Sequence, residues 1–438
     1  DMDYDPVAET GVFTCRWSSL PAPGESFTEA RSKGFGDRPI PWQSCFVRVG
    51  GAGALMPIAE TVRTPVIPLA EGISRIQAAT PAGPAVTLYL EKRSGNTIRL
   101  PEWLDPKKIS DEGVKAFPAK LRAECDAALA AFDERRRTGT PLEFMAWCTY
   151  RASSTGRAWL YGGRDPRLLD LLREQADFAL SLQRDDGTFS AFHMRRGFGD
   201  PKARWQGGAY DTGPAGELYA VAARILGDSK YREGSEKLLR AYRGYRAEFN
   251  HNFCAFALYH LAEHYRLTRD PEALEHGLYY CNTSAAAGIM PLGFQGGHNY
   301  YTCYGAITLR GLCHFCSILP EDHPFRPVLR ERCIRMGNQL LSRLQTDGLF
   351  DSRDRLFLGE RQWSFGLFSL AFVAGRENVR TLDAAIRFML QRKLERSDGR
   401  KQGDAISGWD RYCENDLILY MAHRDRLLAG ESIHGTAL

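Results

Sequence analysis

Short and long connections alternate along a series of helical segments, and this alternation limits the folds open to the chain. After Pro106, apolar residues recur with the period of a helix almost to the end of the 438-residue sequence. The pattern predicts twelve helical segments, at residues 114–137, 141–161, 165–184, 212–228, 230–247, 251–268, 271–284, 299–318, 325–345, 361–375, 377–393 and 408–427.

The short connections carry a helix-start signal. An Asp stands at the expected N-cap in Asp165-Pro166, Asp228-Ser229 and Asp270-Pro271. The Asp side chain accepts hydrogen bonds from the unpaired N–H groups of a first turn, and a following Pro has a backbone angle already suited to a helix. We therefore expect a new helix to begin directly after each of these residues.

The long connections are rich in Gly and aromatic residues and contain a repeat. Residues 182–189 read Leu-Gln-Arg-Asp-Asp-Gly-Thr-Phe, and residues 344–350 read Leu-Gln-Thr-Asp-Gly-Leu-Phe. Ser397-Asp398-Gly399 is a weaker third copy. Recurrence of one turn at matching places indicates repeated helical hairpins.

Twelve helices joined by alternating short and long connections predict a mainly α fold, an (α/α)6 toroid of six helical hairpins. The even-numbered segments, rich in small and aromatic residues, would form the inner ring, and the more charged odd-numbered segments would face solvent. The long loops would then build a funnel above the N-termini of the inner helices, where the helix dipole favours anions.

Residues 1–105 have a different pattern. Short β-rich runs alternate there with Gly/Pro turns, as in residues 45–49, 64–69, 72–78 and 85–91. We predict a small antiparallel β domain at 1–105, a toroid catalytic domain at 106–430 and a tail at 431–438.

Composition excludes several other classes of protein. The net charge of +4 is too small to indicate nucleic-acid binding, and no apolar run is long enough to predict a membrane span. Eleven cysteines in so long a chain do not indicate a disulfide scaffold, and the single CxxC at Cys313 and Cys316 lacks the two further ligands of a structural zinc site. We expect no metal, no cofactor and no membrane partner. A secreted or periplasmic location is predicted, with a signal peptide already removed.

Polar residues collect where the funnel is expected. His251, Asn250 and Asn252 open one inner helix, and His298, Tyr301 and Tyr304 open the next. These six are the candidate catalytic residues. The candidate substrate-binding residues are Arg195, Arg196, Arg204, Trp205, Tyr210, Asp211, Tyr300, Arg361, Trp363, Trp409 and Asp410.

This mixture of residue types suits cleavage of a uronate glycan by β-elimination. An Asn can bind the substrate carboxyl group, a neutral His or a tyrosinate can take the C5 proton, and a Tyr can protonate the leaving O4. Basic side chains would hold neighbouring anionic sugars, and Trp or Tyr would stack on their faces. The predicted partner is therefore an acidic polysaccharide or oligosaccharide.

The run 295–309 resembles the His…Tyr-Thr-Gly-x-Tyr-Gly segment of chondroitin and hyaluronate lyases, although it is one residue shorter. Their helical domains are also α/α toroids. The resemblance implies catalytic roles for His298 and Tyr304 and carboxylate binding by Asn250 or Asn252. In those lyases the β domains typically follow the toroid, whereas here the β-rich region precedes it.

Two segments are also similar to alginate lyases. Asn250-His251 resembles their Asn-His pair, and residues 298–300 resemble their Tyr-His-Asn-aromatic segment. Gly297 stands where those enzymes carry the catalytic Tyr, so Tyr300, Tyr301 or Tyr304 would have to supply that group.

Other functions stay open at this point. An inverting, uronyl hydrolase-like glycosidase would use two carboxyl groups, for which Asp211 and Asp410 are the first candidates, ahead of Asp404, Glu414 and Asp416. A uronyl C5-epimerase would share the proton abstraction, and a non-catalytic carbohydrate- or partner-binding module would need none of this chemistry. We take the polysaccharide lyase as the main hypothesis.

Several candidates also have a purely structural interpretation. His251 and His298 could be capping or core residues, Asp211 an N-cap before Thr212, and the basic run a solvated surface. Tyr300, Tyr301 and Tyr304 cannot all face the funnel, because positions i, i+1 and i+4 span different helix faces. The histidines deeper in the helices, His260, His264 and His314, are expected to be structural.

Overall fold

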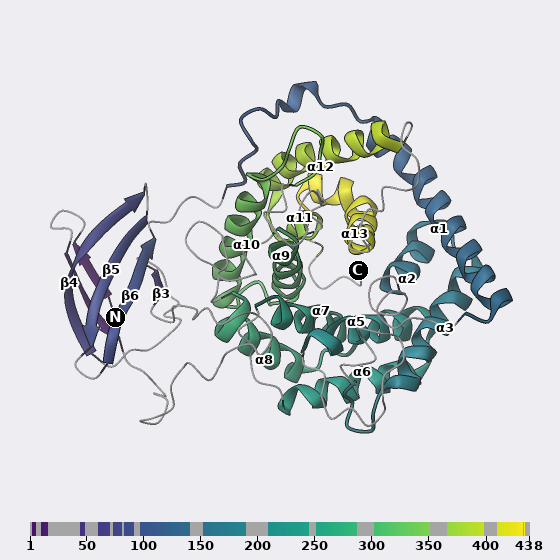
Figure 1. Ribbon diagram of the computed structural model, residues 1–438, viewed down its shortest axis with the longest axis horizontal. Coiled ribbons are helices and arrows are strands. Elements are labelled where there is room, and N and C mark those ends of the chain that lie inside the picture. Colours follow the sequence, from purple (N-terminus) through teal and green to yellow (C-terminus); the bar gives the residue numbers. More distant parts are fainter. Residues whose placement is uncertain are drawn as a thin grey trace.

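The structure is a computed structural model, and its twelve described α-helices form two concentric rings (Figure 1). It describes residues 2–5, 10–15, 44–48, 60–70, 73–80, 83–91, 97–140, 152–189, 209–244, 251–286, 302–350, 366–397, 410–431 and 433.

The inner ring contains every second helix. Its members are α2 (Ala152–Tyr161), α5 (Ala209–Leu226), α7 (His251–Thr268), α9 (Thr302–Cys316), α11 (Gly366–Leu370) and α13 (Asp410–Ala429). Each inner helix packs against the next, and α13 returns to pack against α2, which closes the ring.

The outer ring contains the alternate helices. They are α1 (Glu112–Thr138), α3 (Pro166–Leu182), α6 (Ser229–Ala241), α8 (Pro271–Tyr280), α10 (Phe325–Leu341) and α12 (Arg376–Ser397). The predicted helical toroid is thus confirmed, together with the assignment of even-numbered segments to the inner ring. Short 3-10 turns at Pro106–Lys108 and Tyr242–Gly244 and a π-helical turn at Cys281–Ala285 complete the helical part.

The predicted helix starts are confirmed at all three short connections. Asp165 Oδ1 accepts from the backbone N–H of Arg167, and Asp228 and Asp270 cap α6 and α8 in the same way, with N···O distances of 2.9–3.0 Å. The helix starts were readable from the sequence because capping is a local interaction.

The repeated motif forms the same turn after α3 and after α10. Asp186 and Asp347 each accept from the backbone N–H two residues later. Gly187 and Gly348 have φ of +85° and +79°, a conformation that residues with a Cβ adopt only at a cost. The Phe that ends each copy is fully buried and so anchors the turn to the core.

Close approach of the inner helices depends on two glycines. A Cβ on Gly213 would lie 2.0 Å from the carbonyl oxygen of Phe256, and one on Gly311 would lie 2.4 Å from that of Ala255. Both contacts are far shorter than atoms permit. Helices α5 and α9 therefore pack on either side of α7 at a distance that only glycine allows.

Two boundaries differ from those expected. Helix α5 begins at Ala209, so Asp211 is the third residue of the helix and its interpretation as an N-cap is wrong. The described part of the predicted segment 361–375 contains only a short helix, Gly366–Leu370.

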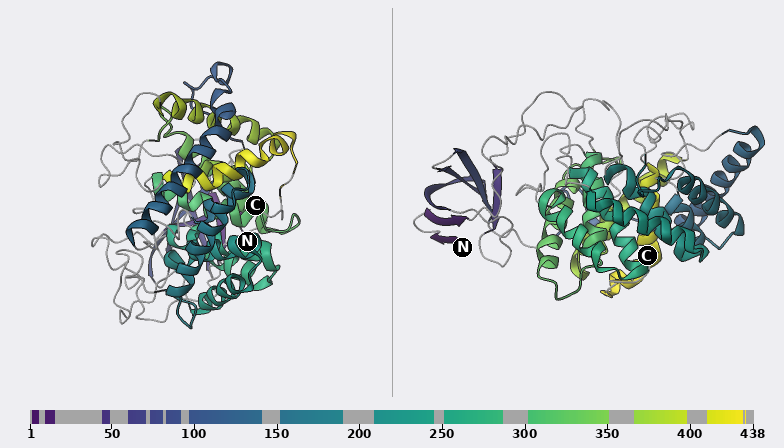
Figure 2. Two further views of the ribbon diagram at one scale, coloured as in Figure 1. Left: turned by 90° about the vertical axis from the view of Figure 1, so that its right-hand side faces the viewer. Right: turned by 90° about the horizontal axis from the view of Figure 1, so that it is seen from below.

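The strands gather around the N-terminus in one sheet (Figure 2). They are β1 (Met2–Asp5), β2 (Thr10–Cys15), β3 (Ser44–Arg48), β4 (Glu60–Ala70), β5 (Ile73–Thr80) and β6 (Gly83–Glu91), in the order β1-β2-β4-β5-β6-β3. Neighbours pair antiparallel except β3 and β6, which are parallel. That this region forms an independent domain stays a prediction.

The chain segments that precede the first helix and follow the last helix both contact the helical core. Asn378 of α12 accepts from the backbone N–H of Ile98 at 2.7 Å, and the side chain of Asn338 of α10 bonds both to Arg99 N–H and to Thr97 C=O. At the other end Ile433, within the segment assigned to the tail, is 1% exposed and lies in the main core.

Candidate functional site

The first turns of the inner helices lie at one rim of the ring. Consecutive helices alternate between the outer and inner ring, so all inner helices run in the same direction and the three Asp-capped turns lie at the opposite rim. We call the end with the inner N-termini the mouth. Parallel helix N-termini at one end give the mouth a positive potential, which favours an anionic ligand.

Helix α7 brings two of the candidate catalytic residues to the mouth. His251 is its first residue and is partly exposed, and its Nδ1 lies 3.1 Å from Ser284 Oγ. Asn252 is 1% exposed. Asn252 stands eleven residues, about three turns, before Glu263, so both side chains leave α7 on the same face.

The adjacent helix α9 begins at the same rim. Its first residue, Thr302, is buried, and its Oγ1 accepts from Nη1 of the buried Arg343 at 2.9 Å. Tyr304 lies two residues further along and is partly buried against the main core. Helix α7 packs against α9, and His251, Asn252 and Tyr304 lie in the first turns of these two helices.

The other predicted site residues are placed only in part. Tyr210 and Asp211 belong to the first turn of α5, and Asp410 is the first residue of α13. Those that lie outside the described residues are His298, Tyr301, Asn250, Arg195, Arg196, Arg204, Trp205, Tyr300, Arg361, Trp363 and Trp409.

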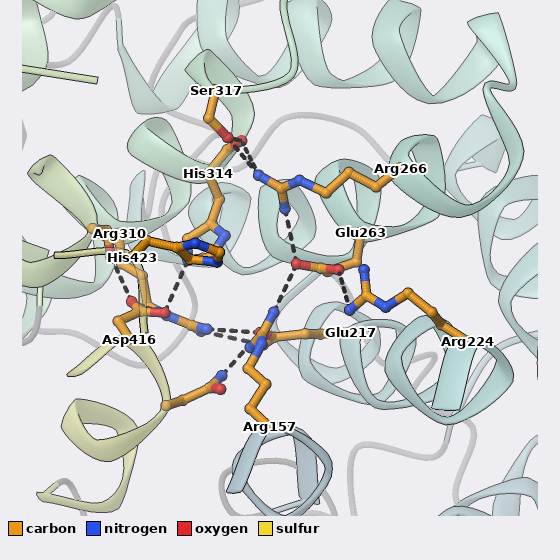
Figure 3. Close-up of polar contacts among 12 residues, drawn as sticks. Arg157, Glu217, Arg224, Glu263, Arg266, Arg310, His314, Ser317, Asp416 and His423 are labelled. Carbon is orange, nitrogen blue, oxygen red and sulfur yellow. Dashed lines mark hydrogen bonds and ion pairs between the residues drawn. The ribbon is translucent and has the colours of Figure 1, made fainter. Parts of the chain in front are cut away.

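A network of buried charges fills the ring beneath the mouth (Figure 3). Arg157 of α2 donates to Glu217 of α5 and to Glu263 of α7, each at 2.7 Å. Arg310 of α9 donates to Glu217 at 2.7 Å and, through Nε, to Asp416 of α13 at 2.6 Å. Helices far apart in the sequence are therefore joined at the axis of the ring.

Further side chains complete this network on every side. His314 Nε2 lies 2.9 Å from Asp416 Oδ1, and Ser369 of α11 donates to the same carboxylate. Arg266 and Arg224 pair with Glu263 at 2.8 and 3.2 Å. All six inner helices contribute at least one member, so the network sets the position of each helix relative to the others.

The electrostatics of the network keep its carboxylates ionised. Burial by itself raises the pKa of Glu217, but Arg310 and Arg157 outweigh it and lower the pKa. Burial also raises the pKa of Asp416, but Arg310 and His314 outweigh this effect and hold that pKa well below its usual range. A carboxyl group held ionised in an ion pair cannot serve as a general acid near neutral pH.

The position of Asp416 corrects one of the alternatives. It was a secondary candidate for a hydrolase carboxylate, but it is fully buried and paired with Arg310 and His314. The sequence interpretation also missed Arg157, Glu217 and Arg310. Their signal was available: each is a charged residue near the middle of a small-residue or apolar inner-ring segment, where an unpaired charge would be costly.

A second buried cluster looks like a hydrolytic triad but is not accessible. Ser235 Oγ lies 2.8 Å from both His260 Nε2 and His264 Nδ1, and His264 Nε2 lies 4.0 Å from Asp270 Oδ2. Ser235, His260 and His264 have no exposed surface, so no substrate reaches them. His260, His264 and His314, which were expected to be structural, are all buried in the helical core, and burial lowers the pKa of all three.

The cysteine side chains that the structure describes are buried; they belong to Cys125, Cys254, Cys281, Cys303, Cys313, Cys316 and Cys333. Cys313 and Cys316 lie in α9, where burial raises their thiol pKa well above the usual range, and Cys316 ends the helix. Within the described ranges no group of three or more His, Cys, Asp or Glu side chains has the arrangement of a metal site. In the same part of the chain, no helix has the length and apolar character needed to cross a bilayer.

Comparison with known proteins finds similarity in structure and none in sequence. No protein-family model and no curated protein matches the chain. A solved polysaccharide lyase is 13% identical, with a TM-score of 0.47 and coverage of 72% of this chain and 99% of that one.

Two further similar structures belong to other classes of enzyme. An unsaturated glucuronyl hydrolase from Streptococcus agalactiae is 13% identical, with a TM-score of 0.49 over 74% of this chain and 97% of its own. A sugar epimerase from a ruminal bacterium is 9% identical, with a TM-score of 0.49 over 65% of this chain and 90% of its own. The similar structures thus include a lyase, a uronyl hydrolase and an epimerase.

Proposed function

We propose that the chain is a polysaccharide lyase that cleaves an acidic, uronate-containing glycan by β-elimination at the mouth of the toroid. One observation supports the proposal: α7 and α9 pack against each other, and His251, Asn252 and Tyr304 lie in the first turns of these two helices. An amide, an imidazole and a phenol can supply the carboxyl binding, the base and the acid that β-elimination requires.

The amide would act on the substrate carboxyl group. Asn250 or Asn252, two residues apart, would donate a hydrogen bond to the carboxylate and lower the barrier to removal of the neighbouring C5 proton. Asn252 is 1% exposed, so the role falls to it only if substrate binding opens its side chain to the mouth. The inner-helix N-termini at the mouth would stabilise the negative charge that builds up on that carboxylate as the proton leaves.

The imidazole and the phenol would move the protons. His298 is the preferred base, and Tyr304 is the preferred acid toward the leaving O4. His251 is a second imidazole at the same rim, and its contact with Ser284 holds the ring in one orientation. Loss of the C5 proton and of the O4 substituent forms a C4=C5 double bond in the sugar at the new non-reducing end.

The basic and aromatic residues of the long loops would bind the rest of the chain. Arg195, Arg196 and Arg204 would pair with neighbouring carboxylates, and Trp205 or Trp363 would stack on sugar faces. Because the proposed substrate is a polysaccharide, we predict that the protein acts outside the cytoplasm.

An inverting hydrolase is the second candidate, and one observation keeps it open. Asp211 lies in the first turn of α5 and Asp410 begins α13, so both backbones reach the mouth on either side of α2. The described carboxylates nearer the axis are unsuitable, because Glu217, Glu263 and Asp416 are buried in ion pairs. A hydrolase would therefore depend on Asp211 and Asp410.

A single assay separates these functions. The protein is incubated with a panel of uronate polysaccharides while ultraviolet absorbance and reducing ends are followed together. A lyase produces both signals, because its product contains a conjugated double bond, whereas a hydrolase produces reducing ends alone. An epimerase produces neither but exchanges the C5 hydrogen with deuterated solvent, and a binding module leaves all three readouts unchanged.

A further inference from the structure

A cavity of about 180 Å³ lies outside the mouth, between the outer helices α1 and α3 and above the inner helices α2 and α13. Helices α1, α2 and α3 lie together in Figure 1, and contacts join all three. Near one end of α1, Arg135 and Arg136 form ion pairs with Glu174 of α3, which hold the two outer helices together. The cavity is therefore part of the wall of the ring.

The sequence of α1 explains why space remains here. Its side toward the cavity carries Ala127, Ala128 and Ala131, whose methyl groups are too short to fill the gap to α3. The remaining walls are mainly apolar and include Leu121, Leu171 and Ile418. A larger residue at any of the three alanine positions would occupy part of this volume.

Two polar atoms of the lining lack partners within the described part of the chain. Gln175 is 1% exposed and Ser154 is 8% exposed, and neither Gln175 Oε1 nor Ser154 Oγ has a hydrogen-bond partner there. Leaving a buried polar atom unsatisfied costs about 1–3 kcal/mol. A ligand that satisfied both atoms would recover part of that cost.

The geometry points to a binding site for a small uncharged molecule that has an apolar body and one hydroxyl group. The hydroxyl would donate to Gln175 Oε1, which can only accept, and would accept from Ser154, whose own hydroxyl can donate. The apolar body would lie against Leu121, Leu171 and Ile418.

The volume of the cavity and its mainly apolar lining favour such a molecule over an ion or a water molecule. The one charged residue of the lining, Glu124, is exposed at the edge, so a charged ligand would have no buried counter-ion. The cavity opens to solvent at Glu124, Ala127 and Ala131, and an apolar molecule that displaces water from the walls removes their apolar surface from water. An enclosed apolar cavity of about 150 Å³ binds benzene in another protein, so the volume here is sufficient for a ring of that size although this cavity is open at one side.

Phenol and benzene are the probes that test the proposal on the full chain. Calorimetric titration should show phenol binding about five- to tenfold more tightly than benzene, as one well-formed hydrogen bond predicts. Phenol should also raise the Tm, because it binds the folded state. In Gln175→Met, which keeps the volume but removes the acceptor, this preference for phenol should disappear while benzene still binds.

Two alanine substitutions provide the matched pair. Ala128→Leu should fill the cavity and abolish binding of both probes, whereas Ala130→Leu, at an exposed position of the same helix outside the lining, should leave binding unchanged. If Gln175→Met does not fold, Ser154→Ala tests the same preference. No binding of either probe to the unmodified chain, equal binding of both, or full binding to Ala128→Leu would each overturn the site.

Discussion

Arg310 and Asp416 pair at 2.6 Å in the axis of the ring, although 106 residues separate them in the sequence. Arg310 belongs to the fourth inner helix and Asp416 to the last, and their contact exists only when the ring is closed. Arg310 also lies over the ring of Tyr259 at 4.1 Å, so its charge is held by the neighbouring α7 as well. The pair therefore forms only when the ring of inner helices is correctly closed.

The first prediction concerns this pair. Replacing Arg310 by Met leaves Asp416 and Glu217 buried with fewer partners, so the free energy of unfolding should fall by about 3–5 kcal/mol. Urea denaturation measures the loss. Arg380→Met, at a half-exposed position of α12, should change stability by no more than about 0.5 kcal/mol. Equal effects of the two substitutions would contradict a stabilising role of the network.

The second prediction is a loss of stability in mild acid. Burial lowers the pKa of His260 and His264 in the folded state, so below about pH 6.5 the unfolded chain binds protons that the folded chain does not. Stability should therefore fall as the pH drops from about 6.5 toward 5, by up to about 1.4 kcal/mol per pH unit for each histidine. Urea midpoints across this range measure the slope.

A variant identifies the groups responsible for this slope. His264→Gln cannot titrate, so its stability should fall less steeply with acid than that of the unmodified chain. His276→Gln, on the outer helix α8, provides the control and should retain the steep dependence. Parallel slopes for the unmodified chain and His264→Gln would show that His264 takes no part.

The third prediction tests the proposed proton transfers. His298→Ala and Tyr304→Phe should each reduce kcat on the best uronate substrate about a hundredfold or more, since general acid–base catalysis contributes about 10²–10⁴-fold. Tyr301→Phe shows whether the neighbouring phenol acts instead. Tyr279→Phe, at an exposed position of α8, is the control for loss of a phenol oxygen. Near-normal kcat in all three site variants would place catalysis elsewhere.

The fourth prediction separates lyase from hydrolase. Asp211→Asn should leave substantial lyase activity, because β-elimination needs no carboxylate at that place in α5. A hydrolase would lose about 10²–10⁴-fold in rate with the same change. Reducing ends and ultraviolet absorbance are measured together, with Asp410→Asn in parallel. Near-total loss in an Asp211→Asn protein of unchanged Tm would favour the hydrolase.

The fifth prediction concerns the basic loop. Replacing Arg196 and Arg204 by Ala should raise KM more than it lowers kcat, since contacts made equally in ground and transition states affect binding alone. Salt should raise KM of the unmodified protein, because exposed charges are screened over about 8–10 Å near physiological ionic strength. An unchanged KM with no response to salt would return these residues to an ordinary solvated surface.

The helical architecture was largely predictable because its signals are local. Each Asp cap acts on an N–H two residues away, and each Asp-Gly turn closes within five residues. The start of α5 was misplaced because Asp211-Thr212 has the sequence of an N-cap, whereas the helix extends back to Ala209. The observed helix thus begins three residues before Thr212, an extension that local capping preference does not indicate.

The site was predictable only as a set of residue types at helix starts. That His251, Asn252 and Tyr304 reach one rim follows from the alternation of helices between rings, which the connection lengths indicate. The roles of His298, Tyr301 and Asn250, which lie outside the described residues, stay predictions.

Periodicity, caps and turns, all readable in a few neighbouring residues, were enough to establish six hairpins and the order of inner and outer helices. The partners of Arg157, Arg310 and Asp416 were not readable in this way. Glu263 pairs with Arg157 across 106 residues, and no local pattern relates the two. The pairing of buried charges depends on how each inner helix is rotated and how far it is shifted along its axis. Close packing at Gly213 and Gly311 and the contact of α13 with α2 set these positions together, so only the complete ring determines the partners.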